Sequence, residues 1–477
     1  MNGNSWRGGC ADVADASPVE DAMRVAIGRI GLVLLVGVLS VADAPAQGAG
    51  GPLAAGLKAY EANDYAKALE MWKPLAEAGN IEAEFYLGYM YEMGQGVAAD
   101  PEVAVNWYRK AASLGHAKAQ YDLGLAYLKG HGVKLDPVEA ARWLEKSAKQ
   151  GHVPAQFAIG LLYLKGSGVA KDEAVGASWV ISAGQQGYVP AEEVLGTLYA
   201  QGVGVEKDLT KAVTWLRAAA KQGSPEAVYR LAQLNPAAGA KPGEAGTLEK
   251  IRRAAELGYP QAQYDLAAAL AEGNGVAKNE AEAVEWLRKA ADQGHPRACY
   301  DLGHMIAEGQ GVAKDPAKAV ELYRRAAAND FPEAQYALGL ALTTGTGTAR
   351  KPEEGFSWIL KAAESGLAKA QYAAGSMYMD GQGVGRDYAQ AMTWFKRGAD
   401  QGDADSMYAL GNLYANGWGV AKDPKEGTKW YCAAARHGQS WALKMFRGRK
   451  LDDVCPAPSS QPMPSQVPPS QPTPQAR

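Results

Sequence analysis

The chain has 477 residues, of which 47% are hydrophobic and 21% are charged, so it is neither a disordered nor a collagen-like chain. The net charge of -3 argues against a protein that binds nucleic acid through a basic surface. Four cysteines exclude a disulfide-dense scaffold, and the combination of 56 Gly, 23 Tyr and 12 Trp with only 6 Phe is typical of a repeated unit.

The first 46 residues are predicted to be a secretory signal peptide. Two arginines precede the apolar run 30–41, and small residues follow it up to Ala44 and Ala46 in the spacing of a cleavage site. The run is shorter than the ~20 residues with which a helix spans a bilayer. We expect cleavage after Ala46 or Ala44 and a periplasmic or secreted mature protein without an integral membrane segment. The alternative is an uncleaved membrane anchor.

Residues 1–22 carry several acidic side chains, among them Asp12 and Glu20, which are unusual in front of a signal sequence. We therefore interpret 1–22 as a start-site extension and Met23 as a candidate first residue.

A period of 36 residues runs through the body of the chain. Gly-x-Gly pairs open at Gly94, Gly130, Gly166, Gly202, Gly273, Gly309, Gly345, Gly381 and Gly417. Thirteen residues later stand Trp107, Trp143, Trp179, Trp215, Trp286, Leu322, Trp358, Trp394 and Trp430, and a further Gly ends each unit except at Asp330. Self-similarity of this length predicts a repeat array.

Each unit is predicted to form two helices. In residues 116–151, apolar side chains recur at helical spacing over 119–129, and the turn at Gly130 ends this first helix. Asp136-Pro137 begins the second helix, because Asp caps free N–H groups and Pro suits the first helical position. The second helix is expected to bury Ala140, Trp143, Leu144 and Ala148.

The repeated pattern A-x-x-Y-x-L-G-x-x-Y-x-x-G-x-G-V, followed by D, W and A-A at fixed spacing, resembles the Sel-1-like repeat (SLR) of the tetratricopeptide (TPR) superfamily. The resemblance implies an all-α fold, a right-handed α-solenoid superhelix of about ten to eleven two-helix repeats. The predicted organisation is a TPR-like repeat over 47–79, SLR sub-arrays over 80–234 and 247–438, an irregular loop over 235–246, a capping helix over 439–455 and a proline-rich disordered tail over 456–477. The loop is either a hinge or a plain surface loop, and the tail is disordered, a spacer or a ligand for another module.

No motif for catalysis or for a cofactor is found, since H-E-x-x-H, C-x-x-C, G-x-S-x-G and Walker loops are missing from the sequence. His116, His152 and His295 share one repeat position, and ligands one repeat width or more apart do not close on one zinc ion. We expect no enzyme activity, no cofactor and no metal.

Two cysteines near the end of the array are candidates for a disulfide. Cys432 belongs to the last repeat and Cys455 follows the capping helix, so a bond would hold that helix in place in an oxidising compartment. The alternative is two free thiols. Cys299 is left unpaired.

One position of the first helices is aromatic in nine of ten repeats and points away from the buried leucine beside it. The nine residues are Phe85, Tyr121, Phe157, Tyr229, Tyr264, Tyr300, Tyr336, Tyr372 and Tyr408, and Glu193 is the exception. In this superfamily the first helices line the concave face. The rings either stack between neighbouring first helices or form a track that binds a ligand.

The resemblance implies an exported, non-catalytic scaffold that binds a partner protein or peptide on its concave face, in envelope complex assembly or signalling. The alternative is a module of polysaccharide export or cell-wall metabolism that binds a glycan, for which tyrosine is equally suited.

Overall fold

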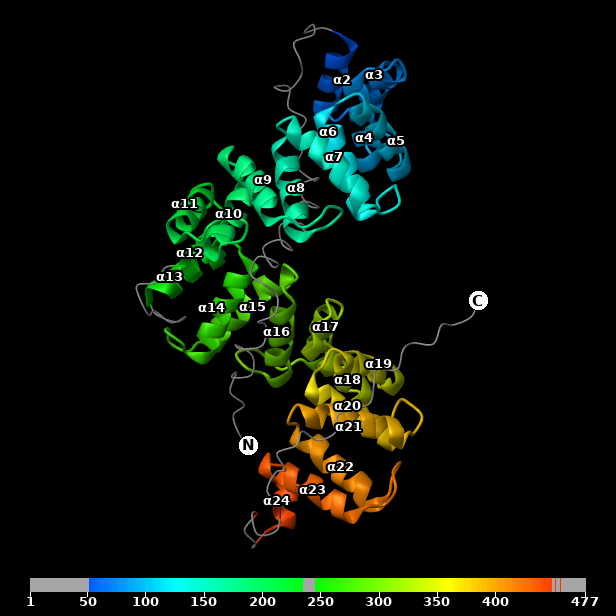
Figure 1. The fold of residues 1–477 in the computed structure, drawn as a ribbon, viewed down its shortest axis with the longest axis vertical. Coiled ribbons are helices and arrows are strands. Elements are labelled where there is room, and N and C mark those ends of the chain that lie inside the picture. The colour runs from blue at the N-terminus through cyan, green and yellow to red at the C-terminus, as the bar shows by residue number, and fades with distance from the viewer. Residues whose placement is uncertain (1–50, 235–244, 448–450, 452–454, 456–477) are drawn as a thin grey trace. The chain divides into compact units, whose positions relative to one another are not determined.

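The computed structural model describes residues 51–234 and 245–447 together with Leu451 and Cys455. The predicted signal peptide, most of the irregular loop 235–246 and the proline-rich tail lie outside these residues. Within the described part of the chain every regular element is an α-helix, and none is a strand (Figure 1). The predicted all-α repeat fold is confirmed.

The helices follow one another in pairs of similar length. Their bounds are α2 (Pro52–Glu61), α3 (Tyr65–Glu77), α4 (Ile81–Met93), α5 (Pro101–Ser113), α6 (Ala117–Lys129), α7 (Pro137–Lys149), α8 (Val153–Lys165), α9 (Glu173–Gln185), α10 (Val189–Gln201), α11 (Leu209–Lys221), α12 (Pro225–Leu234), α13 (Ala245–Glu256), α14 (Pro260–Glu272), α15 (Glu280–Asp292), α16 (Pro296–Glu308), α17 (Pro316–Ala327), α18 (Pro332–Thr344), α19 (Pro352–Glu364), α20 (Ala368–Asp380), α21 (Tyr388–Asp400), α22 (Ala404–Asn416), α23 (Pro424–Arg436) and α24 (Ser440–Met445).

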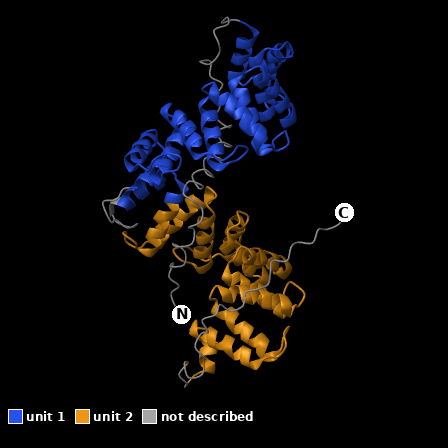
Figure 2. Cartoon of the chain, in the orientation of Figure 1, with its two compact units in different colours: residues 1–262 blue, residues 263–477 orange. Residues whose placement is uncertain are grey.

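The chain divides into two compact units, Met1–Ala262 and Gln263–Arg477 (Figure 2). The division falls inside α14, which lies C-terminal to the irregular loop. Within each unit, first and second helices alternate, and neighbours such as α6 and α7 or α7 and α8 pack on one another. Each unit is therefore a stack of helix pairs.

The second helices that start with Asp-Pro at α5, α7 and α23 begin as the sequence predicts. Asp136 is the N-cap of α7, and its Oδ1 accepts hydrogen bonds from the backbone N–H groups of Val138 at 3.0 Å and Glu139 at 3.1 Å. Pro137 occupies the first helical position, where no N–H is needed. The same arrangement starts α5 and α23.

The two glycines of each Gly-x-Gly turn are needed for different reasons. Gly130 ends α6 in the left-handed region with a φ of 66°, which only glycine adopts cheaply. Gly132 also has a positive φ, and in addition a Cβ there would collide with the backbone oxygen of Pro101 in the preceding repeat. The second glycine is therefore required where one repeat touches the next.

Alanine and leucine fill the space between the helices. Ala140, Leu144 and Ala148 of α7 are buried as predicted. The prediction that Trp143 is buried is wrong in part, because its ring is only half-buried and the Nζ of Lys146 lies 4.0 Å from its centre. A lysine or arginine one turn later covers most of the other tryptophans of this row in the same way, among them Trp107, Trp286, Trp358 and Trp394.

A ladder of glutamine pairs, in each of which one glutamine is buried and the other exposed, joins neighbouring helices. The Nε2 of Gln150, after α7, donates to the Oε1 of Gln120 in α6 at 2.7 Å, and the Nε2 of Gln120 donates to the backbone oxygen of Ala112 in the preceding repeat at 3.0 Å. The same pairs recur as Gln186 with Gln156, Gln293 with Gln263, and Gln401 with Gln371. The sequence signal is a glutamine at a constant repeat position, and the sequence analysis missed its role.

Candidate functional site

The aromatic row of the first helices changes character along the chain. Each of its members is the fifth residue of its helix, as in α4, α6 and α8. The first five rings are buried: Phe85, Tyr121, Phe157, Tyr229 and Tyr264. The last four are half-buried: Tyr300, Tyr336, Tyr372 and Tyr408.

The five buried rings and the half-buried ring of Tyr300 pack against the residue that precedes the first helix of the next repeat. The ring of Phe85 stacks on His116, with the two ring centres 4.6 Å apart, and Phe157 meets Tyr188 at 5.4 Å. The same contact joins Tyr121 to His152, Tyr229 to Tyr259, Tyr264 to His295 and Tyr300 to Phe331. In these repeats the rings therefore stack between neighbouring first helices.

The capping residue is not aromatic in the last three repeats. Leu367, Asp403 and Gln439 stand where the earlier repeats have histidine, tyrosine or phenylalanine. Burial raises the pKa of Tyr336 and of Tyr372, and the negative charge of Asp403 raises both further. We call Tyr336, Tyr372 and Asp403 the tyrosine–aspartate patch.

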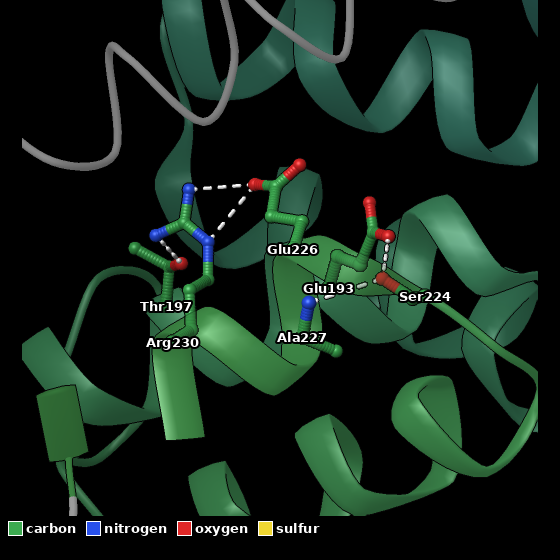
Figure 3. Close-up of polar contacts among 6 residues, drawn as sticks. All are labelled: Glu193, Thr197, Ser224, Glu226, Ala227 and Arg230. Carbon is green, nitrogen blue, oxygen red and sulfur yellow. Dashed lines mark hydrogen bonds and ion pairs between the residues drawn. The ribbon is translucent and has the colours of Figure 1, made fainter. Parts of the chain in front are cut away.

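A polar network replaces the aromatic contact at Glu193, the exception in the row (Figure 3). The hydroxyl of Ser224 donates to the Oε1 of Glu193 and accepts a hydrogen bond from the N–H of Ala227 at 3.0 Å. Ser224 precedes α12 at the position where Tyr188 precedes α10. A hydrogen bond thus joins the same two positions that a ring contact joins elsewhere.

A second group of polar contacts beside it contains an ion pair on α12 (Figure 3). The Nε and Nη2 of Arg230 donate to the Oε1 of Glu226 at 2.9 and 2.8 Å, and the Nη1 donates to the Oγ1 of Thr197 in α10 at 3.1 Å. The side chain of Glu226 is only 3% exposed. Because a buried carboxylate is costly without such partners, the network holds α12 in one register against α10.

The candidate disulfide is formed in the structure. The sulfur atoms of Cys432 and Cys455 are bonded, and the two Cα atoms are 5.5 Å apart. Arg436 of α23 also donates to the backbone oxygen of Cys455 at 3.2 Å. Cys299 is free and buried in α16, where its Sγ lies 3.6 Å from the backbone oxygen of Ala291.

The three histidines that share a repeat position are N-cap residues of first helices. His116 and His295 each accept a hydrogen bond through Nδ1 from the N–H three residues later, at 3.0 and 3.1 Å. Among the described residues no group of His, Cys, Asp and Glu is placed to hold a metal ion. The same residues include no helix that is long and apolar enough to cross a membrane.

Comparisons with known proteins match this architecture. The family model of the Sel1 repeat matches residues 55–80, 81–116, 117–152, 153–188, 189–224, 260–295, 296–331, 332–367, 368–403 and 404–439. The interval 225–259, which contains α12 and the irregular loop, is not matched. No curated protein matches the chain.

Among solved structures, the chain is 30% identical to a protective antigen of uropathogenic Escherichia coli that displays an SLR fold. That comparison covers 88% of this chain and 89% of the antigen, with a TM-score of 0.52. A Sel1 repeat protein from Oxalobacter formigenes is 28% identical over 81% of this chain and 99% of its own, with a TM-score of 0.35.

Proposed function

Because the chain belongs to the Sel1 repeat family, we propose that it is a non-catalytic scaffold that binds a partner protein or peptide through its first helices. The observation that supports this proposal is the change in the aromatic row after Tyr300. The rings of the row up to Tyr300 pack on an aromatic residue that begins the next repeat. Tyr336 and Tyr372 are followed there by Leu367 and Asp403, and both tyrosines keep part of their surface exposed.

The patch favours a partner segment that combines an apolar and a basic side chain. Tyrosine offers an apolar ring face and a polar hydroxyl, and it is enriched at protein interfaces for this reason. The carboxylates of Asp403 and Asp405 stand at the start of α22, and the negative charge of each acts on Tyr372. A lysine or arginine of the partner would pair with these carboxylates while its neighbour contacts the rings.

The proposal is tested by capture from an envelope extract on the immobilised protein. We expect one protein to be retained in a fixed ratio, and Tyr336→Ala with Tyr372→Ala to lower its retention at least tenfold, because two aromatic contacts at an interface centre are lost. Asp403→Asn should weaken retention while keeping the N-cap, since Asn caps helices as well as Asp does.

Two matched variants control for damage to the fold. Tyr378→Ala removes another half-buried tyrosine from α20, the helix that carries Tyr372. The ring of Tyr378 contacts Phe356 and is not part of the patch, so the partner should still be retained. Tyr336→Phe with Tyr372→Phe keeps both rings. Retention of polysaccharide alone, or capture that the alanine variants leave unchanged, would contradict a protein-binding patch and favour the glycan alternative.

We also infer that the protein is exported. The signal pattern before Ala46 supports this inference, and so does the Cys432–Cys455 bond, since structural disulfides persist in oxidising compartments. The N-terminal residue of the protein purified from its own cells checks it. A chain that begins at Pro45 or Gln47 is expected, whereas Met1 or Met23 as the first residue would contradict cleavage.

A further inference from the structure

An exposed pair of aromatic rings joins two successive repeats of the second unit. Trp418 lies in the turn between α22 and α23, and its ring stacks on that of Tyr388 in α21, with the ring centres 6.0 Å apart and the ring planes at 20°. Trp418 is 42% exposed and Tyr388 is half-buried. The tyrosine–aspartate patch belongs to first helices, so a role for this pair goes beyond the proposed function.

Both rings depart from the repeat pattern. Tyr388 is the first residue of α21, and proline holds this position in α5, α7, α17, α19 and α23. The residue between the two glycines is not tryptophan, tyrosine or phenylalanine in the other Gly-x-Gly turns, where it is Gln95, His131, Ser167, Val203, Asn274, Gln310, Thr346 or Gln382. The other repeats therefore fold without such a pair, and its exposed ring surface is available for a ligand.

The turn that carries Trp418 is held close to α21. A Cβ at Gly419 would collide with the Cβ of Tyr388, so only glycine permits this approach. Gly417 precedes Trp418 and ends α22 with a φ of 76°. The two neighbours of Trp418 thus offer no side chain that would donate to or accept from the hydroxyl groups of a sugar stacked on the ring.

Flat, uncharged rings of this kind suit proline. A proline-rich segment adopts the extended polyproline helix before it binds, and it packs its rings on aromatic side chains. Proline also loses no side-chain rotamer freedom when it is buried. The pair therefore favours an uncharged, proline-rich segment over a charged one.

Residues 456–477 of this chain have that composition. They lie outside the described residues, and their sequence contains eight prolines and a single charged side chain, that of Arg477. Hydrophobic contact with prolines needs no further charge at the site.

The point from which these residues start is within reach of the pair. Cys455 is bonded to Cys432 in α23, and the two Cα atoms are 5.5 Å apart. Cys432 lies about 12 Å along α23 from Pro424, where this helix begins after the Trp418 turn. A polyproline helix rises about 3.1 Å per residue, so residues 456–477 span about 68 Å, several times this path.

We propose that residues 456–477 dock on the Trp418–Tyr388 pair of the same chain through their prolines. The disulfide keeps the segment beside the pair at a high effective concentration. A proline-rich segment of another protein would then bind this surface only by displacing residues 456–477.

Fluorine NMR of the full-length protein labelled with 5-fluorotryptophan tests the proposal. The comparison is with a tail variant that carries Pro→Ser at all eight prolines of 456–477. The signal of Trp418 should shift in this variant, because its ring loses the docked prolines. The signal of Trp358, which Lys361 covers in the same unit, should stay in place.

A synthetic peptide with the natural sequence of 456–477 provides the reciprocal test. Added to the tail variant, it should return the Trp418 signal to its position in the unmodified protein and should bind with a saturable isotherm in calorimetry. The same peptide with Pro→Ser at all eight positions should do neither.

Two substitutions remove the rings with residues that the repeat already accepts. Trp418→Gln introduces the residue that Gln382 provides one repeat earlier, and Tyr388→Pro introduces the residue that begins α19 and α23. In the tail variant, either change should weaken binding of the natural peptide at least tenfold, because an aromatic contact at the centre of the surface is lost. Circular dichroism should show the same helix content for each.

Trp441→Ala is the matched control, because it removes a tryptophan of α24 that is 59% exposed and outside the pair. The affinity for the peptide should be unchanged, as it should be in the Tyr336→Ala, Tyr372→Ala variant, which separates this surface from the tyrosine–aspartate patch.

Three results would overturn the proposal. The first is a Trp418 signal that does not respond to the tail variant. The second is a Trp418 signal of the unmodified protein that changes on dilution, which would place the segment on a second copy of the chain. The third is a hexamer of N-acetylglucosamine that shifts the Trp418 signal of the tail variant while the peptide does not, which would indicate a glycan.

Discussion

At the scale of single residues, the N-cap of a first helix contributes both to the start of the helix and to the contact with the preceding repeat. Its side chain or backbone starts the helix, and in six repeats its ring also packs on an aromatic residue of the preceding repeat. Histidine serves both tasks at His116, where Nδ1 accepts a hydrogen bond and the ring face covers Phe85. This explains why histidine recurs at a position that is unsuited to a shared metal.

Asp330 is the one residue that replaces glycine at the end of a repeat, and its φ of 54° lies in the left-handed region. We expect Asp330→Gly to raise the free energy of unfolding by about 0.5–1 kcal/mol, because a non-glycine residue is strained there. The gain is limited by loss of the weak contact between Asp330 and the Nε2 of Gln335. Urea denaturation of the two proteins measures the difference in free energy of unfolding.

The reciprocal change provides the control for this position. Gly294 is the equivalent residue one repeat earlier, with a φ of 83°. Gly294→Asp should destabilise by a similar amount. If Asp330→Gly has no effect while Gly294→Asp destabilises, the contact with Gln335 outweighs the backbone strain.

Asp301 should make stability depend on pH. Burial raises the pKa of this carboxyl to about 6, although a hydrogen bond from Tyr264 and the charge of Arg297 oppose the shift. Because the folded state holds this proton more tightly than the unfolded state, stability falls as the pH rises from about 4 to about 6. Asp301→Asn should therefore stabilise the protein at pH 8, by at most about 3 kcal/mol, and should gain little at pH 4.

Thermal unfolding at the two pH values measures this difference. Asp400→Asn, at the exposed end of α21, is the control and should change neither value. An equal gain in stability for Asp301→Asn at both pH values would show that burial of the charged carboxylate does not destabilise the fold.

At the scale of helices, the same two repeat positions are joined by a ring contact in most repeats and by a hydrogen bond in one. Phe157 and Tyr188 meet through their rings, whereas Glu193 and Ser224 meet through a hydrogen bond. The change coincides with α12, whose interval is not matched by the repeat family. Hydrogen bonds are directional, so the bond from Arg230 to Thr197 positions α12 against α10. The sequence that follows α12 lacks the Gly-x-Gly pair of the other repeats.

The disulfide should stabilise the C-terminal helices. It links α23 to the segment after α24 across 23 residues of sequence. In the chain-entropy model a loop of this size is worth about 3 kcal/mol. Cys432→Ser with Cys455→Ser should lower the stability of this end by about that amount, and hydrogen exchange should rise in α23 and α24 before other helices. A reducing agent should destabilise the unmodified protein but leave the double variant unchanged.

At the scale of the whole molecule, the repeats should behave as exchangeable layers. Deleting one full period, residues 368–403, joins Leu367 to Ala404, which occupies the same position as Ala368. Because each repeat contacts only its neighbours, this deletion should preserve the helix content per residue and a cooperative transition.

Deleting only residues 368–385 removes the first helix and leaves α21 without its partner. We expect this variant to lose helix content and to aggregate, because buried residues such as Phe395 become exposed. Circular dichroism and size-exclusion chromatography compare the two deletions. Equal behaviour of both would contradict a structure built from two-helix layers.

The sequence by itself determined the period, the helix pairs and most helix ends. Asp136 caps α7 and Gly130 ends α6 as predicted, because both devices depend on residues within a few positions along the chain. The places of Cys432 and Cys455 at the end of the array made them candidates for a disulfide, but two free thiols remained the alternative until the structure showed the bond. What the partner is stays a proposal, since no local pattern names it.

Only the tertiary structure decided which surfaces remain available. Phe157, which packs on Tyr188, is buried, whereas Tyr372, whose next repeat begins with Asp403, is half-buried. The glutamine ladder and the contact between Tyr388 and Trp418 likewise combine residues that lie apart in the sequence. Helix ends depend on backbone groups close in sequence, whereas burial and charge depend on side chains that only packing brings together.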